Sequence, residues 1–263
     1  MAYSEETLRE IALKEKLFSL GDFDLCKFGD KNSLQVLSLA EATRQRIKAS
    51  GSAEWDWITT DLINAASSNI VFSLKNVFYY LPGINNLARE YVEDSDYGLI
   101  LPTYHQTTSD LRYLYYVSVT FEKLYAYWDR IGDLFDLVFD VIKNKDGIYF
   151  PVVVDALTAK FKSQSANMQW LQDFAKNEYS QSLNKYRKRI VHIRSLNQDF
   201  LEGVLTANFR EKEECLKYLD GLQKEREGFA LLLKDQLHLT IVGFECAINL
   251  INELEPLANI RAD

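Results

Sequence analysis

The chain is poor in residues that interrupt secondary structure. Its 263 residues include only four prolines and eleven glycines, which predicts long, uninterrupted elements. The three cysteines, Cys26, Cys215 and Cys246, are scattered and form no Cys-x-x-Cys pair. This spacing argues against a disulfide framework and against a zinc knuckle. A reducing cytoplasm is therefore the expected compartment.

Sequence signals of several other protein classes are also missing. The N-terminus has neither the basic segment nor the apolar run of a signal peptide. No charge-free apolar stretch of about 18 residues is present, so no membrane-spanning helix and no membrane partner are expected. The Gly-rich phosphate loop, the Gly-x-Ser-x-Gly turn and the His-Glu-x-x-His pair are absent. We therefore expect no Rossmann or P-loop fold, no cofactor and no metal.

The composition is that of an ordinary globular protein with an acidic surface. Apolar residues make up 47% of the chain and charged residues 26%, and the formal net charge is −8. A negative overall field disfavours general coating of nucleic acid. It leaves room for a local basic site, because distant exposed charges are screened beyond about 8–10 Å at physiological salt.

Apolar residues recur at helical spacing along most of the chain, which predicts an all-α fold. The expected architecture is a bundle of long, mostly antiparallel up-and-down helices. The state of 195–208 is left open. Helices are predicted from Ser4 to Gly21 and over 33–49, 55–81, 84–92, 107–143, 149–162, 166–180, 182–194 and 211–255, the last closed by Pro256.

Residues 93–105 contain Asp-Ser-Asp, Tyr-Gly and Leu-Pro and are predicted to be a connection. It is the best candidate for a domain boundary. We expect an N-terminal helical region over 1–100 and a helical bundle over 107–256, with one continuous domain as the alternative.

The helix predicted over 107–143 carries an acidic stripe opposite its apolar face. Charge runs of this kind are usually solvated, so the stripe is predicted to face solvent or a partner. The alternative is a carboxylate-metal site, but such bundles use Glu-x-x-His pairs that this sequence lacks. The stripe consists of Glu122, Asp129, Asp133, Asp136 and Asp140.

The most distinctive segment is basic. No carboxylate occurs between Glu178 and Asp199, whereas five cations do: Lys185, Arg187, Lys188, Arg189 and Arg194. His192, one of three histidines, lies five residues after Arg187. Arginine can bind phosphate oxygens through its planar fork of donors, and histidine can transfer protons near neutral pH. This pair of residues suits phosphodiester chemistry without a metal.

The segment Tyr186-Arg187-Lys188-Arg189-Ile190-Val191-His192-Ile193 resembles the Arg-x(4–6)-His signature of HEPN domains (higher eukaryotes and prokaryotes nucleotide-binding). The resemblance would cover about 107–256. It implies a small up-and-down helical bundle that often dimerises. Many members are metal-independent ribonucleases of toxin–antitoxin, abortive-infection or antiviral systems, whereas others only bind RNA or a nucleotide. Lys188 departs from the pattern, since the family prefers Asn, Asp or His there.

By this resemblance Arg187 would bind the scissile phosphate and His192 would be the general acid and base. Lys185, Lys188 and Arg189 would add contacts to the substrate. The expected partners are RNA or a nucleotide, a second copy of the chain, and an antitoxin or other protein. Two alternatives remain: a non-catalytic helical module that binds RNA, a nucleotide or a protein, and a basic helix face that has no ligand.

Geometry sets a condition on the predicted site. On an uninterrupted α-helix, residues five apart point about 140° from each other. Arg187 and His192 would therefore converge only if the helix ends or distorts near His192, or if a second subunit completes the site.

Overall fold

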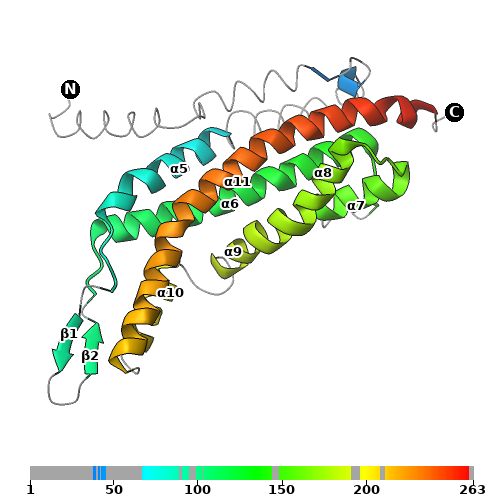
Figure 1. Cartoon of the computed structure of the whole chain (residues 1–263). Coiled ribbons are helices and arrows are strands. Elements are labelled where there is room, and N and C mark those ends of the chain that lie inside the picture. Colours follow the sequence, from blue (N-terminus) through cyan, green and yellow to red (C-terminus); the bar gives the residue numbers. More distant parts are fainter. Residues whose placement is uncertain are drawn as a thin grey trace, which may run out of the picture. The chain divides into compact units, whose positions relative to one another are not determined.

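A computed structural model of the chain describes residues 38–39, 41, 43–45, 67–88, 91–94, 99–102, 104–143, 148–190, 196–207 and 211–260 (Figure 1). The predicted all-α helical bundle is confirmed, with a small β-hairpin added. The described helices are α5 (Ser67–Tyr80), η3 (Leu81–Gly83), α6 (Thr108–Phe139), α7 (Phe150–Phe161), α8 (Ala166–Phe174), η5 (Ala175–Leu183), α9 (Asn184–Lys188), α10 (Leu196–Ala207) and α11 (Lys212–Ile260).

The chain forms two compact units, and helices α6 and α11 contribute to both. Among the described residues, the first unit contains those of Phe72–Phe121 and Arg187–Asp235. The second contains those of Asp24–Val71, Glu122–Tyr186 and Gln236–Asp263. The predicted domain boundary within residues 93–105 stays a prediction.

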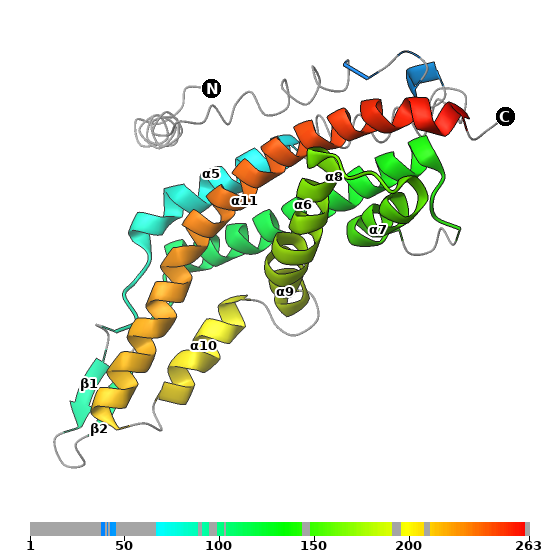
Figure 2. The ribbon, with the colours of Figure 1, turned by 45° about the vertical axis from the view of Figure 1, so that its right-hand side comes forward.

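In the first unit, successive helices run in alternating directions (Figure 1). Phe121 of α6, Phe200 of α10 and Phe229 of α11 are buried and meet edge to face, with ring centroids 5.9 and 6.2 Å from Phe229. Figure 2 shows α10 beside the first part of α11. Gly203 allows this close approach, because a Cβ there would lie 2.8 Å from a methyl group of Leu222.

The prediction of a short helix over 84–92 is wrong. Residues 84–86 have no regular structure, and Tyr91–Asp94 form strand β1, which pairs antiparallel with β2 (Leu99–Pro102). The register places Tyr91 opposite Pro102 and Asp94 opposite Leu99. Aromatic and β-branched residues favour strands, and the intervening Ser-Asp-Tyr-Gly is rich in turn formers. Strand β2 lies against α10 in the same unit.

The N-terminal predictions can be tested only in part. Of the helix predicted over 55–81, the structure describes α5, which gives way at Leu81–Gly83 to a 3₁₀ turn, as the Pro-Gly pair predicts. Of the helix predicted over 33–49, residues 41 and 43–45 are helical. The helix predicted from Ser4 lies outside the described residues.

The second unit has an aromatic core around Trp128 of α6. Its ring lies 4.1 Å from Phe174 and 4.7 Å from Phe150, centroid to centroid, and its indole N–H donates to Thr240 Oγ1 of α11 (3.2 Å). Gly243 lies directly against this core, because a Cβ there would come within 2.4 Å of the Trp128 ring. The core thus leaves room for hydrogen alone at residue 243.

Helix α7 confirms the helix predicted over 149–162. Pro151 lies in its first turn, where the missing N–H costs nothing. The helix ends at Phe161, and the next residue, Lys162, takes the left-handed conformation with φ 53°. Local signals near residues 151 and 162 therefore decide this helix.

Helix α6 ends at Phe139, four residues before its predicted end. Asp136, only 6% exposed, accepts hydrogen bonds from the backbone N–H groups of residues 141 (3.1 Å) and 142 (2.9 Å). Asp140 takes a positive φ of 46°. A carboxylate at this point redirects the chain by satisfying donors that a continuing helix would have satisfied itself.

The acidic stripe is therefore not one solvated face. Glu122 and Asp140 are exposed, as predicted, but Asp129 is half-buried and accepts a hydrogen bond from the Tyr179 hydroxyl (2.7 Å). Burial, first of all, and the Asp129 charge raise the pKa of Tyr179 far above its ordinary value, so this hydroxyl stays a donor. The prediction is wrong for Asp129 and Asp136, whose carboxylates serve the fold.

Helix α11 continues past Pro256 to Ile260, so the prediction that Pro256 closes it is wrong. Proline removes one N–H donor near the helix end, and the residues after it still continue the helix.

By length and hydropathy alone, 212–255 of α11 could cross a membrane, but 56% of its most apolar window is buried inside the structure. Core helices of soluble bundles meet the same two criteria.

Candidate functional site

The basic segment lies at the end of one continuous helical stretch. The helices predicted over 166–180 and 182–194 are joined through α8, η5 and α9 up to residue 190. Ser165 caps its start, accepting a hydrogen bond from the Met168 N–H (3.2 Å). The middle part, η5, is a π-helix, in which Ser180 Oγ donates to the Ala175 carbonyl five residues earlier (2.6 Å).

The helix is also π-type at Arg189 and Ile190, directly after α9. A π-helix has i→i+5 hydrogen bonds and wider turns, and it occurs frequently at functional sites. Residues five apart then point in more similar directions than on an α-helix. The uninterrupted α-helix, on which Arg187 and His192 would diverge, is thus interrupted between them. His192 itself lies outside the described residues, so the pairing stays a prediction.

The cations of the segment differ in their surroundings. Lys185 and Lys188 are exposed, and Arg187 is half-buried. The Lys185 ammonium lies 5.7 Å from the centroid of the Tyr186 ring. Exposed ammonium groups on a carboxylate-free stretch are well placed to meet an anionic ligand.

Arg189 is held by two carboxylates within the first unit. Its Nε donates to Asp199 of α10 (2.5 Å), and its Nη1 donates to Glu225 of α11 (2.7 Å). Burial lowers the pKa of Arg189, but the two hydrogen bonds and charges outweigh it, and the net pKa is raised. Its charge is therefore balanced inside the protein, and it fastens the end of the segment to α10 and α11. Its predicted contact with substrate stays a prediction.

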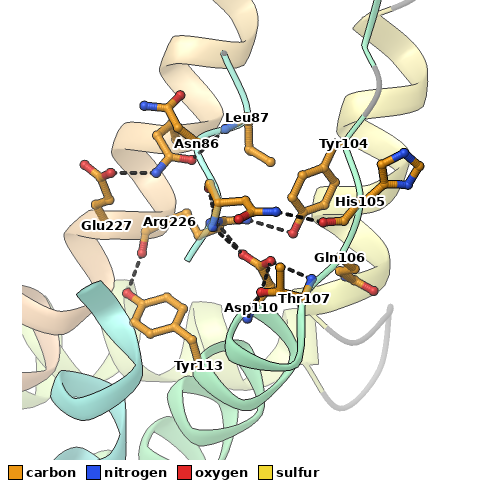
Figure 3. A network of polar contacts seen from close by, with 12 residues as sticks. Asn86, Leu87, Tyr104, His105, Gln106, Thr107, Asp110, Tyr113, Arg226 and Glu227 are labelled. Carbon is orange, nitrogen blue, oxygen red and sulfur yellow. Dashed lines mark hydrogen bonds and ion pairs between the residues drawn. The ribbon is translucent and has the colours of Figure 1, made fainter. Parts of the chain in front are cut away.

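The main polar feature that the sequence reasoning missed is a buried ion pair (Figure 3). Arg226 Nη2 lies 2.8 Å from Asp110 Oδ1, and both side chains are fully buried. The sequence did contain a signal of this ion pair, because Arg226 falls on the buried stripe of α11. This stripe includes Leu219, Gln223, Ala230 and Leu233. A charge at a core position requires a buried partner.

Asp110 also caps α6. Its Oδ2 accepts from the Thr107 backbone N–H (2.8 Å) and hydroxyl (2.6 Å), while Thr107 Oγ1 accepts from the Asp110 N–H (3.1 Å). This is a capping box with aspartate at its third position, so the sequence Thr-x-x-Asp could have been recognised. The same carboxylate thus starts a helix and neutralises Arg226.

The ion pair fastens both ends of the segment that carries the hairpin (Figure 3). Before β1, the Asn85 N–H donates to Asp110 (3.0 Å) and the Asn85 carbonyl accepts from Arg226. After β2, the Tyr104 hydroxyl accepts from Arg226 Nη1 (3.0 Å). Burial raises the pKa of Tyr104 to about 12 against the opposing charge of Arg226. The network is enclosed, so we assign it to structure.

Two further observations bear on ligands. Among the residues that the structure describes, no group of three or more His, Cys, Asp or Glu side chains could hold a metal ion. A shallow groove of about 490 Å³ runs along the first turns of α11 and shares no residue with the basic segment. It is lined by Glu214, Lys217, Tyr218, Gly221 and Leu222.

Comparison with known protein families identifies a match. A family model described as Cthe2314-like HEPN matches residues 59–245, well over half of the chain. The matched range includes the basic segment and the residues of the buried ion pair. Searches of curated proteins and of solved structures find no match.

Proposed function

Because the chain belongs to the HEPN family, we propose that it is a metal-independent endoribonuclease of the toxin or defence type, acting in the cytoplasm as a homodimer. Arg187 binds the scissile phosphate and stabilises the charge that develops on its oxygens. His192 transfers the protons. Lys185 and Lys188 add phosphate contacts along the exposed side of the segment.

The reaction needs one proton removed and one supplied. The ribose 2′-oxygen attacks phosphorus, the new P–O2′ bond forms and the P–O5′ bond breaks. The 2′-hydroxyl proton passes to a base, and the leaving 5′-oxygen takes a proton from an acid. His192 performs one transfer and His192 of the partner subunit performs the other. The products are a 2′,3′-cyclic phosphate and a 5′-hydroxyl.

The observation that carries this proposal is the spacing of Arg187 and His192 in a segment without carboxylates. The π-type turn at 189–190 supports it, since a distortion of the helix is one of the two conditions under which the pair converges. The exposure of Lys185 and Lys188 adds a surface that attracts phosphates.

A second candidate is a non-catalytic module that binds RNA, a nucleotide or a protein such as an antitoxin. The family-atypical Lys188 favours it, because lysine replaces a polar residue inside the motif. Arg189, whose charge is balanced by Asp199 and Glu225, also indicates that the centre of the motif has a structural role.

The test is cleavage of a labelled RNA by the purified chain in the presence of EDTA. We expect cleavage with a 2′,3′-cyclic phosphate end, identified by mass spectrometry. His192→Ala and Arg187→Ala should each abolish turnover. Equal cleavage by His192→Ala would remove the ribonuclease assignment, and binding without turnover would support the second candidate.

Matched controls come from the same chain. His238→Ala removes an exposed histidine of α11, and Lys176→Ala removes an exposed cation of η5. Both variants should cleave at the wild-type rate, since neither residue belongs to the motif. Sedimentation velocity should show a dimer. A 1:1 mixture of wild-type and His192→Ala chains should retain less than half of the wild-type activity after subunit exchange, because each site needs His192 of both subunits.

A further inference from the structure

The first unit carries a second surface whose chemistry suits nucleobases, and it shares no residue with the basic segment. Its rings contact one another: Tyr80 stacks parallel to Tyr116, with centroids 6.0 Å apart and an interplanar angle of 5°, and Phe72 meets Tyr116 edge to face at 6.2 Å. Helices α5 and α6 supply it. This aromatic face consists of Phe72, Tyr79, Tyr80, Arg112, Tyr115 and Tyr116.

Two of these rings are exposed to solvent. Tyr115 is 62% exposed and Phe72 is 59% exposed. Leu111, on the same stretch of α6, is 45% exposed. Large apolar surfaces gathered on one face of a folded protein commonly mark a binding site. The rings of Tyr80 and Tyr116 are half-buried, so the protein holds this part of the aromatic face in place.

The charge of this face has the opposite sign to that of the whole chain. Within Phe72–Tyr80 and Thr108–Phe121 the sequence has one carboxylate, Asp110, and it is fully buried against Arg226. Lys75 and Arg112 lie in the same two ranges. The next carboxylate along α6, Glu122, follows Tyr115 by seven residues, or about 10 Å along the axis.

Arg112 connects the charge to the rings. It is exposed, its guanidinium lies 5.5 Å from the centroid of the Tyr80 ring, and its Nη1 donates to the Tyr80 hydroxyl (3.1 Å). A cation held beside exposed aromatic rings is the arrangement with which proteins bind single strands. Bases stack on the rings while the cation meets the phosphates.

We propose that the aromatic face binds single-stranded RNA, with Phe72 and Tyr115 stacking on unpaired bases and Arg112 contacting a phosphate. The proposal rests on the proposed function, because it takes RNA as the ligand, and it narrows that ligand to unpaired RNA. Tyrosine and arginine also recur at protein interfaces. Phe72–Tyr80 and Thr108–Phe121 carry no exposed carboxylate although the chain has a net charge of −8, and this favours a polyanion over a protein partner.

The test uses full-length His192→Ala protein, so that bound RNA is not cleaved. Fluorescence anisotropy measures binding to a labelled single-stranded RNA and to its duplex. Phe72→Ala and Tyr115→Ala, each added to this parent, should weaken single-strand binding about 5- to 100-fold. Tyr115→Phe keeps the ring and should keep the affinity, as should Tyr149→Ala, which removes a 51% exposed tyrosine of the second unit. The duplex should bind more weakly than the single strand.

Three outcomes would overturn the proposal. Unchanged affinity in both alanine variants, with the parent still binding RNA, removes the aromatic face and leaves the proposed function standing. Unchanged affinity with a shift in oligomeric state by sedimentation assigns the face to a second copy of the chain. Failure of the parent to bind RNA, together with no cleavage by the wild-type chain, removes the proposed function and this proposal with it.

Discussion

Replacing Asp110 by asparagine should destabilise the first unit more than any surface change. The carboxylate of Asp110 accepts hydrogen bonds from the Asn85 N–H, the Thr107 N–H and hydroxyl, and Arg226. Asp110→Asn keeps the shape but leaves the buried guanidinium without a counter-charge. Breaking one partner of a buried ion pair costs about 3–5 kcal/mol. A typical domain has only about 5–15 kcal/mol to lose.

The structure also predicts which single substitution, Asp110→Asn or Arg226→Met, lowers the stability more. After Arg226→Met, the Asp110 carboxylate still accepts three hydrogen bonds. After Asp110→Asn, the acceptors that Arg226 keeps among the described residues are neutral: the Tyr104 hydroxyl and the Asn85 carbonyl. Its buried Nε has no hydrogen-bond partner in the described part of the chain. Asp110→Asn should therefore cost about 4–5 kcal/mol and Arg226→Met about 3 kcal/mol.

The assay is urea unfolding of the two single variants and the double variant. The midpoint should fall by about 1–2 M for Asp110→Asn. The double variant should be more stable than the sum of the single effects by about 2 kcal/mol, because each single change strands a charge that the double change removes. Hydrogen exchange should report loss of protection in the hairpin strands. Additivity within about 0.5 kcal/mol would refute the ion-pair reasoning.

Three further predictions test other parts of the structure. Gly243→Ala should cost about 1–3 kcal/mol in thermal unfolding, because its methyl group overlaps the Trp128 ring. At Gly228 no atom of the described residues lies within 4 Å of an added Cβ, so Gly228→Ala should be neutral or stabilise by up to about 1 kcal/mol. Folding raises the pKa of Tyr104 from 10.0 to about 12, so its stabilising contribution is complete below pH 10 and is lost between about pH 10 and 12. The urea midpoint of the wild-type chain should therefore fall with pH in this window, and that of Tyr104→Phe should fall less. Equal slopes of midpoint against pH in the two proteins would contradict this prediction. Lys188→Ala should reduce the slope of log affinity for single-stranded RNA against log salt by about 0.7, whereas Arg189→Ala, already balanced by carboxylates, should leave the slope unchanged.

The helices could be predicted because their signals are local. Apolar spacing defined α6 and α11, Pro151 marked the start of α7, and Pro82 with Gly83 marked the end of α5. The hairpin was not predicted, because residues 84–92 also suit a helix and residues 93–105 are rich in turn formers. Pairing between 91–94 and 99–102 depends on contacts across a turn, which no helical periodicity reveals.

The candidate site, too, could be predicted from the sequence only in part. The cations of the basic segment could be read directly from the sequence, but their different surroundings could not. Arg189 meets Asp199 and Glu225 only because α10 and α11 bring those carboxylates to it from 10 and 36 residues away. Asp110 and Arg226 lie 116 residues apart, so the helical positions of the two residues hinted at burial while their pairing required the tertiary fold.

The sharing of α6 and α11 between the two units has a consequence for the history of the protein. Neither unit is a contiguous stretch of sequence, and each contains separate segments joined through the other. Genetic recombination that exchanges one continuous piece cannot add or remove a unit without breaking both long helices. The units are thus expected to be inherited together, and an insertion is tolerated more readily between strands β1 and β2 than at the unit boundary within α6.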